Sequence, residues 1–139
     1  MNEASIRQAC TGLIVRYAWL NDERRFEELA ALFTEDAVLY RPSAPDQGIA
    51  GRPAILDAFR KRPLETITFH VTSDVLVDVQ DMENAQARSR ILLLSAARPQ
   101  DGSVLPAETK APVPGVFRDR LVLTGDGWKF SERRGMFWI

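Results

Sequence analysis

The spacing of apolar residues changes once along this chain, and that change limits the folds open to it. Over residues 3–20 the apolar positions recur every three or four residues, as on one face of a helix: Ile6, Cys10, Leu13, Ile14, Tyr17 and Leu20. From Thr66 they alternate with polar residues, as in a strand: Ile67, Phe69, Val71, Val75, Val77 and Val79. Helices followed by hairpin-connected strands predict an α+β fold, with an antiparallel sheet packed on the helices.

Two more helices and a short strand are expected before the period changes. The second helix is predicted from one apolar face: Phe26, Leu29, Ala30 and Phe33. A third helix is expected over about 52–61, because one proline suits its first turn and another ends it. Residues 37–41 are predicted to form a strand, followed by a loop rich in Pro and Gly over 42–51.

The second half of the chain is expected to be a run of long strands. Residues 85–97 return antiparallel to the first long strand, and 116–123 with 128–137 form a closing hairpin. Between them, residues 98–114 carry four prolines and are predicted to form a long excursion that could act as a lid. Long strands curl around what covers them, so we expect a pocket for a small, largely apolar molecule.

The length of the chain favours one domain over residues 1–139, and its charge balance does not favour a polyanionic partner. The 18 basic and 19 acidic residues leave a net charge of −1, so neither nucleic acid nor an anionic membrane is an expected partner. The densest basic cluster, Arg60-Lys61-Arg62, is predicted to be the solvated end of a helix. No stretch approaches the roughly 20 apolar residues that span a bilayer, and residues 1–4 do not resemble a signal peptide, so a cytoplasmic location is expected.

Several kinds of active site are absent from the sequence. There is no glycine-rich phosphate loop and no Gly-x-Ser-x-Gly elbow, and the chain has 1 histidine and 1 cysteine. A multi-histidine or cysteine-based metal site is therefore excluded, and no cofactor is expected. Cys10 is predicted to be a small buried hydrophobe. Any chemistry must come from ordinary side chains.

Fragments along most of the chain resemble the SnoaL-like proteins of the nuclear transport factor 2-like superfamily. They are Arg16-Tyr17, residues 29–38 (LAALFTEDAV), 51–55 (GRPAI), 70–73 (HVTS), 115–121 (GVFRDRL) and 127–134 (GWKFSERR). The resemblance implies a cone-shaped α+β barrel, in which three N-terminal helices pack on a strongly curved, mainly antiparallel sheet with a deep pocket. The nearest branch holds scytalone dehydratase, a bile-acid 7α-dehydratase and a hexachlorocyclohexane dehydrochlorinase, while other members are not catalysts. Fold alone therefore does not settle function.

The resemblance also implies roles for particular residues. His70 would be the general base, Asp22 the carboxylate that orients it, and Tyr17 a hydrogen-bond donor to the substrate. Arg133 would contact the substrate from the last strand, and Leu93 with Phe117 would line the pocket. A histidine suits elimination, because it can remove a proton near neutral pH and return one to a leaving oxygen.

Each of these residues has a second interpretation. Asp22 could cap the second helix, Tyr17 could be a core aromatic, and Arg133 could be a surface charge. Alternation places His70 opposite the valine-rich face of its strand, which leaves either solvent or a polar pocket wall. Where the dehydratases carry a second acid–base group, this chain has the apolar run Ile91–Leu94.

Three functions remain open. The first is a cofactor-independent lyase or isomerase that acts on a small hydrophobic cyclic or polyketide-like molecule. The alternative is a non-catalytic small-molecule-binding or accessory protein of the same fold. The third is a purely structural interaction domain that uses the outer face of the sheet. The resemblance implies a homodimer or homotrimer formed through the sheet in each case.

Overall fold

The computed structural model describes residues 2–103 and 108–138. The helices are α1 (Glu3–Asp22), α2 (Phe26–Ala30) and α3 (Arg52–Arg60). The strands are β1 (Phe33–Tyr40), β2 (Gly48–Ala50), β3 (Thr66–Val79), β4 (Asn84–Ala97), β5 (Val113–Thr124) and β6 (Gly127–Phe137). The α+β class predicted from the change of period is confirmed.

The first helix forms where the apolar period places it, and Asn2 caps its start. The Ser5 backbone N–H donates to Asn2 Oδ1 at 2.9 Å, and the Asn2 N–H donates to Ser5 Oγ at 3.1 Å. Cys10 is fully buried on the inner face of α1, and this burial raises the pKa of its thiol to about 11. No helix among the described residues is both long and apolar enough to cross a membrane.

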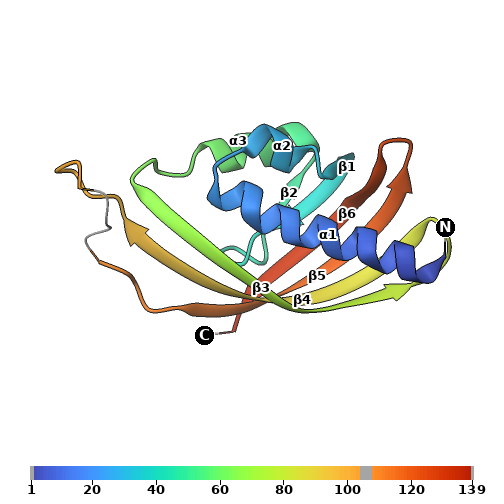
Figure 1. Ribbon diagram of the computed structural model, residues 1–139. Helices are drawn as coiled ribbons and strands as arrows, with labels where there is room; N and C mark the ends of the chain where they lie inside the picture. The colour runs from blue at the N-terminus through green and yellow to red at the C-terminus, as the bar shows by residue number, and fades with distance from the viewer. Residues whose placement is uncertain (1, 104–107, 139) are drawn as a thin grey trace.

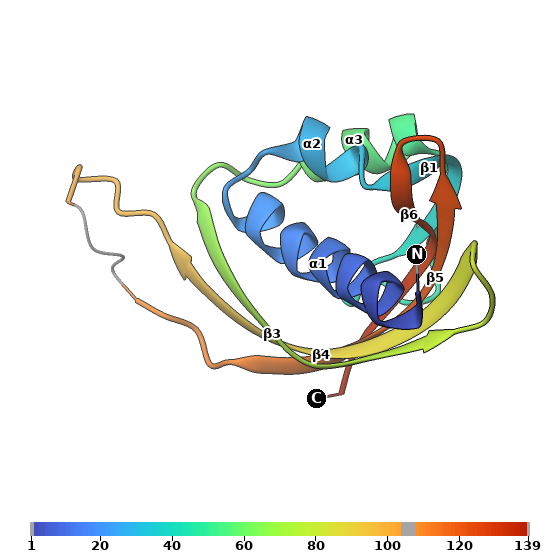
Figure 2. The same ribbon diagram turned by 45° about the vertical axis from the view of Figure 1, so that its right-hand side comes forward.

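All six strands belong to one open, curved sheet in the order β2-β1-β6-β5-β4-β3. Neighbouring strands are antiparallel, except for β1 and β6, which run parallel. Figures 1 and 2 show α1 lying along the concave side of this sheet, with α2 and α3 above its β1 end. The strands at the two edges, β2 and β3, do not pair in the described chain, so the cone is not closed into a barrel.

A β-bulge reverses the faces of β3 halfway along its length. The register with β4 shifts between Ser73 and Leu76, and Asp74 lies in the left-handed region with φ of 52°. Before the bulge, Phe69 points to solvent and is 63% exposed; after it, Val77 packs against the core. The sequence predicted one valine-rich face for the whole strand, and that prediction is wrong because the extra residue changes the phase of alternation.

Other element boundaries differ from the predicted ones because strand pairing determines where these elements begin and end. Phe33 begins β1, because its backbone pairs beside Phe130 of β6, and so it does not extend the second helix. The loop expected over 42–51 contains the short strand β2, which pairs with β1. The lid predicted over 98–114 includes residues 104–107, which lie outside the described residues.

Candidate functional site

Asp22 and His70 meet at the mouth of the cone. Asp22 is the last residue of α1, and its Oδ1 lies 2.5 Å from His70 Nδ1. Its Oδ2 accepts the His70 backbone N–H at 2.7 Å, and the Thr68 hydroxyl donates to Oδ1 at 2.9 Å. A carboxylate can only accept these bonds, so the proton of a neutral His70 belongs on Nδ1 and the free lone pair on Nε2.

This geometry settles how Asp22 is used. The residue before α2 is Arg25, and no side chain caps that helix. The Asp22 carboxylate instead joins α1 to β3 through three accepted bonds. Its side chain is 20% exposed and that of His70 is 12% exposed, so the pair is largely shielded from solvent.

A cavity of about 240 Å³ opens beside His70. Its apolar wall is formed by Phe59, Ile91, Leu93, Phe117 and Phe137. Its polar side chains are Tyr17, Asn21, Arg41, Ser43, Arg62, Thr68 and His70. The structure therefore brings Tyr17, His70, Leu93 and Phe117 to one cavity, and it places Asp22 directly behind His70.

Tyr17 stands in the floor of this cavity within a ring of aromatic side chains. Its ring makes edge contacts with Phe33, Phe59, Phe117 and Phe130, at centroid distances of 5.8 to 6.2 Å. Burial raises the pKa of Tyr17 to about 12, against the opposing effect of the Arg133 charge. The phenol is therefore held as a neutral hydroxyl, the form that donates a hydrogen bond.

Arg133 is fully buried and does not line the cavity. Its guanidinium carbon lies 4.1 Å from the Tyr17 ring centroid and 3.7 Å from that of Phe117, and both of those residues line the cavity. Its Nε is 3.3 Å from Asp119 Oδ1. Burial raises the pKa of Asp119 to about 6, although the Arg133 charge opposes that shift. Any effect of Arg133 on a ligand therefore passes through Tyr17 and Phe117.

The sequence did not single out two of the cavity's cationic residues. Arg62 was expected to be solvated, yet it is half-buried and bonds to the Asn21 side chain and, at 3.0 Å, to Thr68 Oγ1. The signal was present, because Arg62 follows the buried Ile55 and Phe59 at steps of four and three residues. Arg41 directly follows β1, and it continues the alternation of the buried Ala37 and Leu39, which is the signal that points it inward.

The family model for the SnoaL-like domain matches residues 2–134. The chain belongs to this family. Among curated proteins, none matches the SnoaL-like chain in sequence.

Solved structures share the fold of this SnoaL-like domain. A candidate scytalone dehydratase from Novosphingobium aromaticivorans is 24% identical, with a TM-score of 0.74 over 95% of this chain and 83% of that one. A Mycobacterium tuberculosis protein of unknown function is 25% identical, with a TM-score of 0.78 over 94% and 70%. A type 2 hexachlorocyclohexane dehydrochlorinase is 17% identical, with a TM-score of 0.80 over 98% and 87%.

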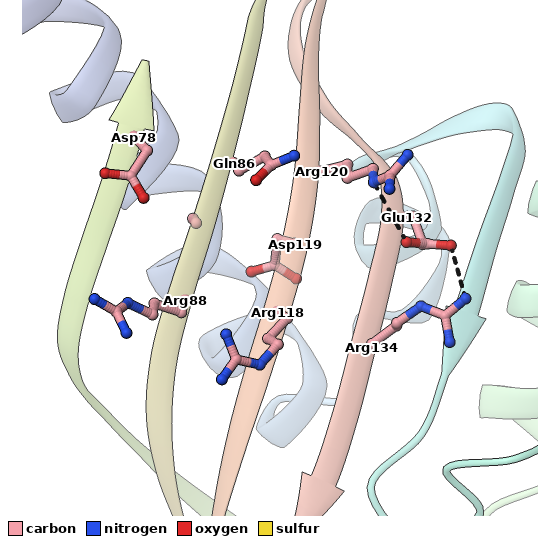
Figure 3. Close-up of a pocket in the computed structure, with 9 residues that line it drawn as sticks. Asp78, Gln86, Arg88, Arg118, Asp119, Arg120, Glu132 and Arg134 are labelled. Carbon is pink, nitrogen blue, oxygen red and sulfur yellow. Dashed lines mark hydrogen bonds and ion pairs between the residues drawn. The ribbon is translucent and has the colours of Figure 1, made fainter. Parts of the chain in front are cut away.

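A second hollow lies on the outer face of the sheet in this SnoaL-like domain. Figure 3 shows charged side chains from β3, β4, β5 and β6 around it, on the side away from α1. Glu132 pairs there with Arg134 at 3.2 Å and with Arg120 at 3.7 Å. This hollow has no aromatic wall and no histidine, so it offers neither an apolar enclosure nor a base that titrates near neutral pH. The cavity beside His70 is the candidate site.

Proposed function

We propose that this SnoaL-like domain is a cofactor-independent lyase or isomerase, acting on a small hydrophobic cyclic or polyketide-like molecule. The observation that carries the proposal is the 2.5 Å contact between Asp22 Oδ1 and His70 Nδ1 at the wall of a mostly apolar cavity. A histidine held by a carboxylate in this way is a base with a fixed ring orientation and a stabilised imidazolium form.

In the elimination, His70 Nε2 removes a proton from the carbon beside a substrate carbonyl. The C–H electron pair becomes a carbon–carbon double bond, and the C–O bond to a neighbouring hydroxyl breaks. The imidazolium returns its proton to the departing oxygen, and water leaves. In the isomerisation the substrate carries a double bond between its β- and γ-carbons, removal of the α-proton gives a dienolate, and the same proton returns to the γ-carbon. General acid–base catalysis of this kind contributes about 10²–10⁴ in rate.

Tyr17 supports either reaction as a neutral donor. Tyr17 lines the cavity, and its pKa of about 12 keeps the phenol protonated at neutral pH. Donation to the substrate carbonyl would stabilise the negative charge that develops as the α-proton leaves.

Proton removal can be tested before the natural substrate is known. The measurement is deuterium incorporation beside the carbonyl of 1-tetralone in D₂O, followed by ¹H NMR. β-Hydroxy ketones of one and two rings are incubated in parallel, and ultraviolet absorbance reports the conjugated enone that elimination would form. We expect exchange above the buffer rate with the wild-type protein and a loss of about 10²-fold or more in His70→Ala.

The matched control is Arg118→Gln, on the outer face of the sheet and away from the cavity. It should exchange at the wild-type rate, and circular dichroism should show that His70→Ala remains folded. Exchange or enone formation that persists in His70→Ala would overturn the assignment of the base.

One observation favours the alternative of a non-catalytic binding protein. Leu93 is the β4 residue directly opposite His70, and together with Ile91 it presents only apolar surface to the cavity. A second acid–base group on β4 is therefore missing from this wall. Tight binding of cyclic ketones without exchange or elimination would select this function.

A further inference from the structure

Two guanidinium groups border the same cavity, and none of its described lining residues is Asp or Glu. Arg41 enters from the end of β1, and Arg62 from the segment after α3. The Asp22 carboxylate, which contacts the cavity residue His70, is already shared by His70 and Thr68. With His70 neutral, the two cations and this one carboxylate leave an excess of positive charge at the cavity.

Arg41 is the less satisfied of the two cations. Its Nε is buried and has no hydrogen-bond partner among the described residues. No ion pair joins Arg41 to a carboxylate in the described part of the chain either, whereas Arg60, two residues before Arg62, pairs with Glu27 at 2.6 Å. A buried donor without a partner is costly, so an acceptor from a ligand would be stabilising here.

Arg62 is held in place but keeps its positive charge close to other cations. It bonds to Asn21 and Thr68, both neutral side chains. Burial, and then the neighbouring charge of Arg24, lower its pKa; the Asp22 charge opposes that shift, and Arg41 adds to it. Like charges in a half-buried site repel each other, and a bound anion would relieve that repulsion.

We propose that this cavity binds a small apolar carboxylic acid, with its carboxylate held by Arg41 and Arg62. Phe59, Ile91 and Leu93 would contact the apolar body, because they are non-polar side chains that line the same cavity. A guanidinium matches a carboxylate with two parallel N–H···O bonds, which adds direction to the charge attraction. The cavity volume of about 240 Å³ lies below the range of about 300–1,000 Å³ that is typical of pockets for drug-sized ligands. The expected ligand is therefore small, with one or two rings.

One part of this inference rests on the proposed function: the bound carboxylate of the ligand would hold a ligand C–H bond beside the His70 base. The binding step stands on the two arginines. Its test therefore measures binding in the absence of turnover, and its outcome is separate from that of the exchange assay.

The experiment is isothermal titration of the whole chain with 2-naphthoate and with 2-naphthalenemethanol. These probes share one apolar body and differ in the anionic group. We expect the wild-type protein to bind the carboxylate about tenfold or more tightly than the alcohol, the size of a charge-assisted hydrogen bond. In Arg41→Gln this preference should fall to about one- to threefold.

Arg118→Gln removes one positive charge from the outer face of the sheet and should keep the full preference for the carboxylate over the alcohol. This variant controls for long-range attraction between the protein and the anion. Arg62→Lys keeps the charge but loses the planar fork, and it should weaken carboxylate binding while the alcohol binds as before. Equal affinity for both probes, no carboxylate binding, or an unchanged preference in Arg41→Gln would overturn the proposal.

Discussion

At the scale of single residues, the ring of His70 is the most sharply defined feature of the site. The Asp22 carboxylate accepts a hydrogen bond from Nδ1–H, so the neutral ring should carry its hydrogen on Nδ1. Since the chain has 1 histidine, a long-range ¹H–¹⁵N spectrum contains one imidazole and needs no assignment. We expect the Nδ1–H tautomer in the wild-type protein.

The variant Asp22→Asn provides the comparison for this tautomer. An amide can donate to Nδ1, and the ring would then carry its hydrogen on Nε2 in a share of the molecules. A wild-type spectrum that showed the Nε2–H form would contradict the arrangement that the 2.5 Å contact describes.

Tyr17 allows a test of burial by pH. The chain has 2 tyrosines, so in the Tyr40→Phe variant Tyr17 is the one that remains. Tyrosinate absorbance then reports the ionisation of Tyr17 alone. The folded protein should show little tyrosinate until the pH approaches 12, while the protein in urea should titrate near about 10. The unfolded chain then loses its proton first, so the free energy of unfolding should fall as the pH rises through this window. Titration near pH 10 with native circular dichroism would show that the phenol is hydrated.

The buried pair of Asp119 and Arg133 makes a prediction about stability. Asp119→Ala leaves the Arg133 guanidinium unpaired at 1% exposure, and we expect a loss of about 3–5 kcal/mol in urea denaturation. The double variant with Arg133→Met should recover most of that loss, because two apolar residues replace the pair. Glu132→Gln, which breaks partly exposed pairs, should cost about 1 kcal/mol or less. A cost for Asp119→Ala as small as that of the control would contradict this view of the pair.

At the scale of elements, the bulge in β3 decides which residues reach the cavity. Asp74 carries the positive φ of 52°, and its side chain makes only an exposed contact with Arg90 at 3.4 Å. Asp74→Gly should therefore be neutral or slightly stabilising, because glycine adopts this conformation without strain. Asp74→Val should destabilise the protein by about 1–2 kcal/mol, since a β-branched residue disfavours it.

Thermal denaturation of the two variants gives the comparison. If valine were tolerated as well as glycine, the bulge would not depend on the left-handed residue. The phase of β3 would then be set by packing alone, through Val77 and its neighbours against α1.

At the scale of the whole molecule, we expect a homodimer or homotrimer formed through the outer face of the sheet. Val71 and Leu92 are paired across β3 and β4 on that face, and they are 41% and 37% exposed. Leu92→Lys should shift the mass measured by light scattering after gel filtration toward the monomer. Leu64→Lys, at a residue 75% exposed before β3, is the matched control and should leave the mass unchanged. A wild-type monomer at working concentration would contradict the expectation.

The sequence by itself determined the fold class, most of the elements and the family. Those depend on local periods of apolar residues and on short motifs, which act over a few positions. It also paired Asp22 with His70, but only through the resemblance, because nothing in a spacing of 48 residues requires contact.

Only the tertiary structure decided which way the decisive side chains face. A single left-handed residue, Asp74, puts His70 and the later valines on the same side of β3, and alternation cannot detect one extra residue. Folding also turned Arg62 inward and buried Arg133. The surrounding helices and strands exclude water there and supply partners for both arginines. The charge of a side chain does not determine whether it is buried. The helices and strands around it decide whether its free energy is lower in water or in contact with a buried partner.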